Sequence, residues 1–248
     1  MVDSRRESYF VIDTETLDVE DSAVVLDLSS VFVNMDGLFK LHNNANNFNP
    51  ITFQAFVDNE FVKKISLFPS VKEQRMLGYT ISKDTLKFWS DQRNEAEEGY
   101  LNYIKKLFNE SGKDSIKEVV DKFEDFVVEC VNVVPSNIQH PNDIYFMERS
   151  GGFDTNKYYH MLKTCREGND TSNMKYWARR EMRTIISCNR WRIPDAYLRR
   201  GTTSWSDEMR EHLREQVGNF TQHVAINDCL IDAYMVYLLK LSIENFYI

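Results

Sequence analysis

The sequence contains few of the residues that crosslink a fold or divide it into parts. Its four cysteines are widely spaced and form no Cys-x-x-Cys pair, which argues against both a disulfide framework and a zinc site. The 248 residues include only nine glycines and five prolines, with no repeat and no Pro/Gly-rich linker. We therefore expect one domain over residues 1–248, with reduced and mostly structural thiols.

Long hydrophobic runs are also missing. No run of apolar residues approaches the roughly 18 needed to span a bilayer. The N-terminus carries two arginines, but a short strand-like segment follows them instead of the apolar core of a signal peptide. We therefore expect a cytoplasmic protein with no membrane partner, and nothing in the sequence indicates its oligomeric state.

The sequence also lacks an excess of positive charge. The net charge is −8, whereas proteins that bind phosphate backbones usually show a basic surface. Residues 175–200 differ from the rest, because eight Lys or Arg residues stand there against two acidic ones. This stretch is either a solvated basic face or a contact for nucleic acid, and charge alone does not decide between them.

The order of apolar patterns indicates an α/β fold with a mixed sheet flanked by helices. Residues 9–15 begin as an apolar run and end in carboxylates, as in a buried strand that emerges at a sheet edge. Residues 23–33 predict a second strand and residues 51–57 a third. The polar residues 42–50 predict a loop between them. Residues 143–147 predict a short later strand.

Helical patterns dominate the middle and the end of the chain. Residues 115–131 show the clearest amphipathic spacing, and Ser82 is a predicted N-cap. Residues 155–165 and 225–245 predict two further helices, the last apolar nearly all round. We expect loops over residues 135–142 and 168–173, and a helical insertion around residues 70–135.

The first candidate for chemistry is the pair Asp13 and Glu15. Because a strand has a period of two, both side chains point to the same side and can converge on one cation. Hard divalent ions such as Mg²⁺ prefer carboxylate oxygens. Alone, the pair is weak evidence, since acidic residues at strand ends are commonly just solvated.

Two later segments add further candidates. Asp154 stands just before a predicted helix, where it is either a helix N-cap or a ligand. His223 and Asp228 are five residues apart, which on a helix separates them by about 140°. We therefore expect His223 in a loop and Asp228 in the first turns of the last helix. The alternatives are an exposed loop histidine and an aspartate that stabilises a helix N-terminus.

Taken together, these residues resemble the DEDDh branch of the DnaQ-like 3′→5′ exonucleases in order and local sequence. The Asp-x-Glu of that family is similar to Asp13-Thr14-Glu15, its middle aspartate to Asp154 after Phe153, and its His-x4-Asp to His223 and Asp228. The resemblance implies a ribonuclease H-like fold.

The resemblance extends beyond these residues. Residues 80–92 are similar to a segment of the phage-type members, which include DexA-like phage exonucleases and related bacterial exoribonucleases. Trp177, Arg180 and Arg183 resemble another stretch of those members, although Glu181 replaces the aspartate expected there. A phage origin, and so a host cytoplasm, is suggested only by this subgroup.

For the mechanism, the resemblance implies two divalent cations, Mg²⁺ or Mn²⁺, held by Asp13, Glu15, Asp154 and Asp228. Sites of this kind hold two ions about 3.5–4 Å apart and stabilise both the attacking and the leaving oxygen. His223 is then the general base, because an imidazole with a pKa near ~6.5 accepts a proton at neutral pH. The implied partner is a single-stranded DNA or RNA 3′ end.

Several neighbouring residues are candidates for substrate binding. Trp89 is a candidate for stacking on a base, although a core tryptophan is at least as good a hypothesis, and Arg183 is either a phosphate contact or part of a structural ion pair. The full set of candidates is Thr14, Thr16, Trp89, Phe153, Arg180 and Arg183.

Three functions compete. The first is a free-standing exonuclease on single-stranded DNA or RNA. The second is a proofreading or repair subunit associated with a polymerase, for which the sequence offers no docking motif. The third is an inactive nucleic-acid-binding protein that retains only the fold. A converging acidic cluster argues against the third, since without metal it would repel phosphate.

Overall fold

A computed structural model describes residues 8–45, 50–133, 144–149, 151–166, 178–188 and 223–245. Its centre is one mixed five-stranded sheet with the order β3-β2-β1-β4-β5. The strands are β1 (Ser8–Thr16), β2 (Val25–Val33), β3 (Val62–Leu67), β4 (Ile144–Glu148) and β5 (Arg179–Glu181). β1 pairs with β2 antiparallel and with β4 parallel, so it is the central strand.

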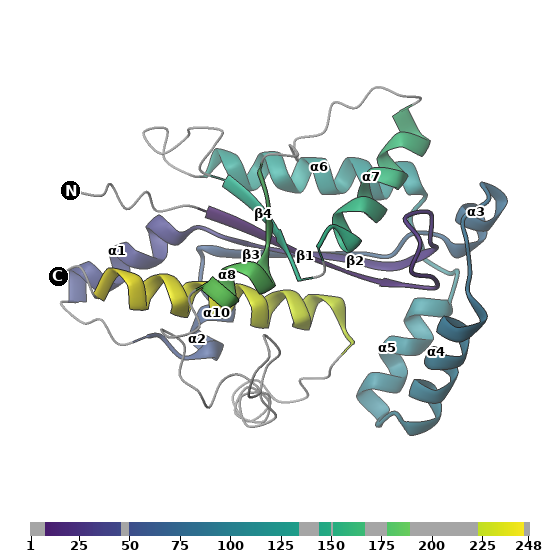
Figure 1. The fold of residues 1–248 in the computed structure, drawn as a ribbon, viewed down its shortest axis with the longest axis horizontal. Coiled ribbons are helices and arrows are strands. Elements are labelled where there is room, and N and C mark those ends of the chain that lie inside the picture. The colour runs from purple at the N-terminus through teal and green to yellow at the C-terminus, as the bar shows by residue number, and fades with distance from the viewer. Residues whose placement is uncertain are drawn as a thin grey trace.

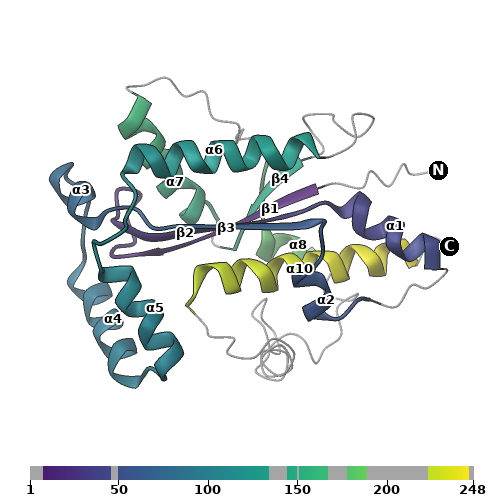
Figure 2. The same cartoon turned by 180° about the vertical axis from the view of Figure 1, so that it is seen from behind.

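Helices cover both faces of this sheet. The described helices are α1 (Met35–Ala45), α2 (Phe53–Val57), α3 (Val71–Met76), α4 (Lys83–Glu95), α5 (Glu98–Phe108), α6 (Ile116–Asn132), α7 (Phe153–Arg166), α8 (Met182–Cys188) and α10 (Ala225–Asn245). Figures 1 and 2 show α6 and α7 over one face, and α10 with α1 and α2 over the other.

The alternation of β1 side chains determines which residues meet which layer. Tyr9 and Val11 are buried in the core that contains α10. Phe10 and Ile12 are buried in the opposite core, which contains α6 and α7. A residue of β1 with an odd number therefore faces α10, and one with an even number faces α7.

The middle of the chain adds a pair of helices, α4 and α5, beyond the end of the sheet. Both figures show this α4–α5 hairpin beside the first residues of α10. Ser82 caps α4 as predicted, because its side chain accepts a hydrogen bond from the Thr85 N–H. The Ser82 backbone N–H in turn donates to the Leu17 carbonyl at 2.7 Å, which joins the hairpin to the end of β1.

Most predicted elements are confirmed by the structure. The strand over residues 143–147, the helix over residues 155–165 and the last helix correspond to β4, α7 and α10. The amphipathic helix is α6, which begins after Ser115 with a complete capping box formed by Ser115 and Glu118. All four cysteines are free thiols, as expected.

The predictions for residues 42–57 differ from the structure, and one strand was missed. The third strand is not at residues 51–57, where the structure has helix α2, because Thr52 caps the Ala55 N–H and Phe53, Phe56 and Val57 are buried at helical spacing. The third strand is β3, which the sequence analysis missed. The predicted loop over residues 42–50 overlaps the end of α1.

The loops predicted over residues 135–142 and 168–173, together with Trp177 and most of the basic stretch over residues 175–200, lie outside the described residues. Among the described helices, none is both long and apolar enough to cross a membrane.

Candidate active site

Three carboxylates converge on the α10 face of β1. Asp13 and Glu15 continue the side of the strand that carries Tyr9 and Val11, as the period of two predicts. Asp228 reaches them from the first turn of α10. One oxygen from each of the three carboxylates lies within 4.8 Å of the other two. We call these three residues the acidic cluster.

Asp154 approaches from the opposite face of β1. It lies in the first turn of α7, and its Oδ1 accepts hydrogen bonds from the Thr14 N–H at 3.0 Å and from the Thr14 hydroxyl at 2.7 Å. Its own backbone N–H and that of Thr155 donate to the buried Glu148 carboxylate at the end of β4. Glu148, and not Asp154, therefore caps α7, so the carboxylate of Asp154 is directed towards β1.

His223 lies in a turn before α10, and Asp228 lies within the helix, as predicted. The backbone of His223 has a φ of +61°, in the left-handed region. Its N–H donates to Asp228 Oδ2 at 3.2 Å, which fixes this strained turn relative to the acidic cluster. The His223 ring packs edge-to-face against Phe88 of α4, with ring centroids 5.2 Å apart.

The electrostatics of the acidic cluster favour bound cations. Burial raises the pKa of Asp13 well above its ordinary value, and the charges of Asp154, Glu15 and Asp228 raise it further. Burial likewise raises the pKa of Glu15, followed by the charges of Asp228 and Asp27. Carboxylates that repel one another in a buried site need a compensating positive charge, and their oxygens are the ligands that hard divalent ions prefer. The residues present therefore fit a divalent cation.

A partly buried ion pair lies next to the acidic cluster. Arg149, just after β4, donates from Nε to Asp232 Oδ2 at 3.0 Å and from Nη2 to Asp232 Oδ1. Asp232 lies one helical turn after Asp228. Burial lowers the pKa of Arg149, but the charges of Asp232, Asp228 and Asp13 raise it above its ordinary value overall. This arginine joins β4 to the helix that carries Asp228.

Another buried carboxylate beside the acidic cluster was missed by the sequence analysis. Asp27 of β2 pairs in register with Glu15 and is completely buried. It accepts hydrogen bonds from Tyr103 of α5 at 2.7 Å and from Ser29 at 2.8 Å. Burial raises its pKa to about 6, although these two hydrogen bonds lower it. Only the antiparallel register of β1 and β2 places Asp27 here, and that register cannot be inferred from the local sequence.

Tyr103 also contacts the start of α10. Burial and the charge of Asp27 raise the pKa of its hydroxyl, and a hydrogen bond from the backbone of Ala225 opposes that rise. Together with Phe88, Tyr103 thus connects the α4–α5 hairpin to the turn that holds His223 and to the first residue of α10. Neither aromatic residue is distinguished by a motif in the sequence.

The structure shows local contacts for four of the candidate substrate-binding residues. The Thr14 hydroxyl is engaged by Asp154, and the Thr16 hydroxyl donates to the Asp18 carbonyl at 2.8 Å. Trp89 is 3% exposed, and its Nε1 donates to the Thr16 carbonyl at 3.1 Å. Phe153, at the start of α7, lies under the Lys157 Nζ, 3.6 Å from the ring centroid.

The two candidate arginines lie on β5 and α8. The Arg180 guanidinium stacks on the Tyr145 ring, 4.1 Å from its centroid, at the edge of the sheet. Arg183 is exposed in the first turn of α8. Glu181 caps this helix by accepting from the N–H groups of Arg183 and Thr184. A role for either arginine in binding phosphate stays a prediction.

Comparisons with known proteins found similar solved structures and a matching family model. Among solved structures, the chain is similar to cell-death related nuclease 4 (CRN-4), with a TM-score of 0.51, 11% sequence identity, and coverage of 97% of this chain and 65% of that one. It is also similar to a moderately thermophilic exonuclease I from Methylocaldum szegediense, with a TM-score of 0.49, 13% identity, and coverage of 97% and 43%. Comparison with curated proteins gave no significant match.

The likeness to CRN-4 shows the fold: a mixed five-stranded sheet flanked by helices, as in ribonuclease H-like exonucleases. This chain spans slightly less than two thirds of the length of that structure. A family model, described as the 3′-5′ exoribonuclease Rv2179c-like domain, matches residues 8–236, which contain all five residues of the predicted site. The chain therefore belongs to the Rv2179c-like family of 3′-5′ exoribonuclease domains.

Proposed function

We propose that this protein is a metal-dependent 3′→5′ exonuclease that removes nucleoside monophosphates from the 3′ end of single-stranded RNA or DNA. The observation that carries the proposal is the convergence of Asp13, Glu15 and Asp228, with Asp154 and His223 beside them. The name of the matched family favours RNA as the substrate. We treat residues 1–248 as one catalytic domain elaborated by the helices of residues 70–135.

Four carboxylates would hold the divalent cations, Mg²⁺ or Mn²⁺. Asp13, Glu15 and Asp228 supply converging oxygens, and Thr14 holds Asp154 against the end of the same strand. When bound, such ions lower the pKa of a water nucleophile and offset charge on the reacting phosphate and the leaving oxygen. The contribution of the chain is to hold these carboxylates in place before the substrate arrives, because each one is fixed by strand register or by a hydrogen bond.

His223 is the proposed general base. It lies five residues before Asp228, and its backbone N–H is bonded to the carboxylate of that residue. The edge-to-face contact with Phe88 restricts the imidazole ring on one side. A positioned imidazole of this kind removes a proton from the attacking water and contributes typically 10²–10⁴-fold to the rate.

The finer identity of the enzyme belongs to the same proposal. The histidine before Asp228 supports the DEDDh branch of the DnaQ-like exonucleases. The family match supports the similarity to bacterial exoribonucleases, and it gives no support for a phage origin. The cytoplasmic location stays a prediction from the sequence.

The competing function is an inactive nucleic-acid-binding or polymerase-associated protein that retains the fold. The acidic cluster weighs against it, because buried carboxylates without a cation repel phosphate and raise the pKa values of one another. A binding protein gains nothing from such an arrangement.

The experiment that tests the proposal is a time course on 5′-labelled single-stranded RNA and DNA oligonucleotides with Mg²⁺, Mn²⁺ or EDTA. We expect a ladder that shortens from the 3′ end with either metal, disappears in EDTA and is greatly weakened in His223→Ala. A comparison of the RNA and DNA rates identifies the preferred sugar. The absence of cleavage for both oligonucleotides in either metal would refute the proposal in favour of the binding protein.

A further inference from the structure

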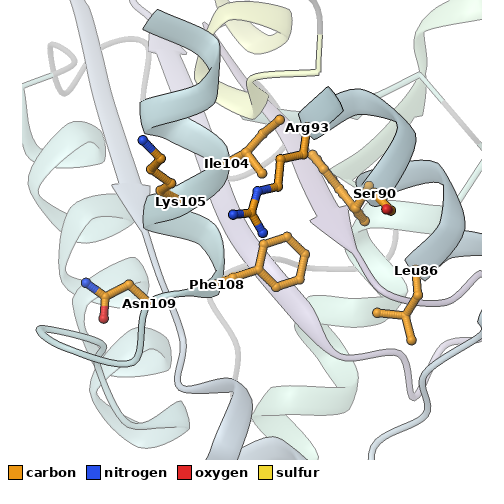
Figure 3. A pocket seen from close by; sticks show the side chains of 8 residues that line it. Leu86, Ser90, Arg93, Ile104, Lys105, Phe108 and Asn109 are labelled. Carbon is orange, nitrogen blue, oxygen red and sulfur yellow. The ribbon is translucent and has the colours of Figure 1, made fainter. Parts of the chain in front are cut away.

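A cavity of about 440 Å³ lies between the two helices of the α4–α5 hairpin, and no residue of the acidic cluster lines it. Figure 3 shows its walls: Leu86, Ser90 and Arg93 come from α4, Ile104, Lys105 and Phe108 from α5, and Asn109 follows α5. Trp89 completes the lining. Pockets for small molecules have volumes of about 300–1,000 Å³, so this cavity is large enough for one nucleotide unit.

The charge of the cavity matches an anion. Its charged lining residues are Arg93 and Lys105, and no acidic side chain lines it. Neither cation forms an ion pair with any of the residues that the structure describes. Phosphate is a ligand for both side chain types, and arginine binds it through two parallel N–H groups.

The apolar part of the cavity offers an aromatic surface. Both Phe108 and Trp89 line the cavity, and Phe108 is 40% exposed whereas Trp89 is buried. The two rings lie edge-to-face, with centroids 6.2 Å apart, so Trp89 supports Phe108 from one side. An exposed phenylalanine beside unpaired cations is the combination with which proteins bind single-stranded nucleic acid without reading its sequence.

The cavity is connected to the acidic cluster through one helix. The Nε1 of Trp89 donates to the carbonyl of Thr16, the residue that follows Glu15. The neighbouring residue Phe88 points to a different side of α4 and contacts His223. The same turn of α4 therefore contacts the catalytic histidine on one side and lines the cavity on the other.

We propose that this cavity binds a nucleotide of the single strand upstream of the 3′-terminal nucleotide, with its base on Phe108 and its phosphate on Arg93 and Lys105. The inference rests on the proposed function, since it assigns the 3′-terminal nucleotide to the acidic cluster. The cavity then contributes affinity for the strand and no chemistry.

The test measures binding separately from hydrolysis. The Asp13→Asn variant in EDTA serves as the background, and fluorescence anisotropy gives its affinity for labelled RNA oligonucleotides of two to ten nucleotides over a range of salt concentrations. Arg93→Gln with Lys105→Gln removes the two cations of the cavity. Lys72→Gln with Lys87→Gln removes two exposed lysines of α3 and α4 that do not line it, and so changes the net charge equally.

We expect the cavity variant to lower the slope of log affinity against log salt by about 0.7 for each lost phosphate contact. The control variant should leave that slope unchanged. Phe108→Ala should weaken binding of the ten-nucleotide RNA by at least roughly fivefold through the loss of base stacking. All these effects should grow with oligonucleotide length and be absent for a nucleoside monophosphate.

Equal effects of the cavity and control variants would overturn the inference, because they would indicate a general effect of charge. An equal loss of affinity for the monophosphate would also overturn it, since the cavity would then bind the product. These failures are distinguishable from failure of the proposed function. If the wild type hydrolyses RNA but the cavity variant has the same salt slope as its background, only the cavity proposal is rejected. If the cavity variant binds RNA more weakly but the wild type does not hydrolyse it, only the proposed exonuclease activity is rejected.

Discussion

The acidic cluster and the α4–α5 cavity are opposite in character, although Trp89 and Thr16 connect them. In the cluster, burial and neighbouring carboxylates raise the pKa values of Asp13 and Glu15. The cavity is apolar with two cations and no acidic residue in its lining. A net charge of −8 is therefore compatible with nucleic acid, because the acidic residues proposed to hold the divalent cations and the basic residues suited to phosphate occupy different places.

This difference between the acidic cluster and the cavity predicts that the rate of hydrolysis and the affinity for RNA can be changed by separate substitutions. Variants of the acidic cluster and of His223 should alter the rate and the response to metal. Variants of the hairpin should alter binding or the stability of the turn that holds His223. The predictions below are ordered from the largest expected effect to the smallest.

His223→Ala should lower kcat by roughly 10²–10⁴-fold, because the proposed general base is lost, and should leave KM within a few-fold. Steady-state hydrolysis of a 5′-labelled RNA measures both constants. His160→Ala is the control, since that histidine lies on α7 and contacts Tyr79. Equal losses in the two variants would show that His223 has no special part in the reaction.

Arg149→Met should destabilise the protein by about 3–5 kcal/mol, because Asp232 is left buried without its partner next to other carboxylates. Urea unfolding at neutral pH measures the loss. The double variant Arg149→Met with Asp232→Leu should recover much of the stability, since it buries no unpaired charge. If the double variant is no more stable than Arg149→Met, the ion pair is not the cause.

The metal-free protein should become more stable when one carboxylate of the acidic cluster is neutralised. A folded-state pKa that is raised above the unfolded value stabilises the fold below the ordinary pKa of the group, and this stabilisation is lost as pH rises through the raised pKa. Asp13→Asn in EDTA should therefore have a higher Tm than the wild type at pH 8, and the gain should shrink towards pH 5.

Added Mg²⁺ should reverse that order. A ligand at 100 times its Kd stabilises the folded state by about 2.7 kcal/mol, which for a chain of this size corresponds to a rise in Tm of roughly 5–10 °C. We expect this rise for the wild type and a much smaller one for Asp13→Asn. Equal rises in a calorimetric scan would place the cation elsewhere.

Tyr103→Phe should cost about 0.5–1.5 kcal/mol, the usual net value of one hydrogen bond. The loss should be larger at pH 8 than at pH 5, because the variant removes a bond that lowers the pKa of Asp27, which is about 6. Thermal unfolding at both pH values measures it. Tyr100→Phe, in the same helix, removes only a bond to Gln92 and should show no such pH dependence.

The sequence predicted the placement of the candidate site residues better than it predicted the fold around residues 35–67. Asp13 and Glu15 follow from the period of a strand, and the placement of His223 before the last helix follows from the angle between residues five apart. Both arguments are local, and the structure agrees with both. The segment over residues 51–57 contains two Phe together with Ile, Thr and Val, so composition favoured a strand. Its burial as helix α2 depends on contacts with α10, such as that of Phe56 with Tyr234.

The features of the candidate site that could not be predicted from the sequence depend on long-range contacts. Asp27 is brought beside Glu15 by the register of two antiparallel strands, and Thr14 is brought to Asp154 across 140 positions. Phe88 and Tyr103 acquire their roles only because the hairpin meets the start of α10. Short sequence motifs do not predict such contacts between distant segments.

The most direct test of the central claim is a single-turnover comparison of the wild type and Asp13→Asn on one labelled RNA, with anisotropy measured on the same samples. The acidic cluster is predicted to perform the chemistry, so Asp13→Asn should bind the RNA with an affinity close to that of the wild type and cleave it too slowly to detect with Mg²⁺. Cleavage by Asp13→Asn at a rate near that of the wild type would contradict the account, because the reaction would then take place without the acidic cluster.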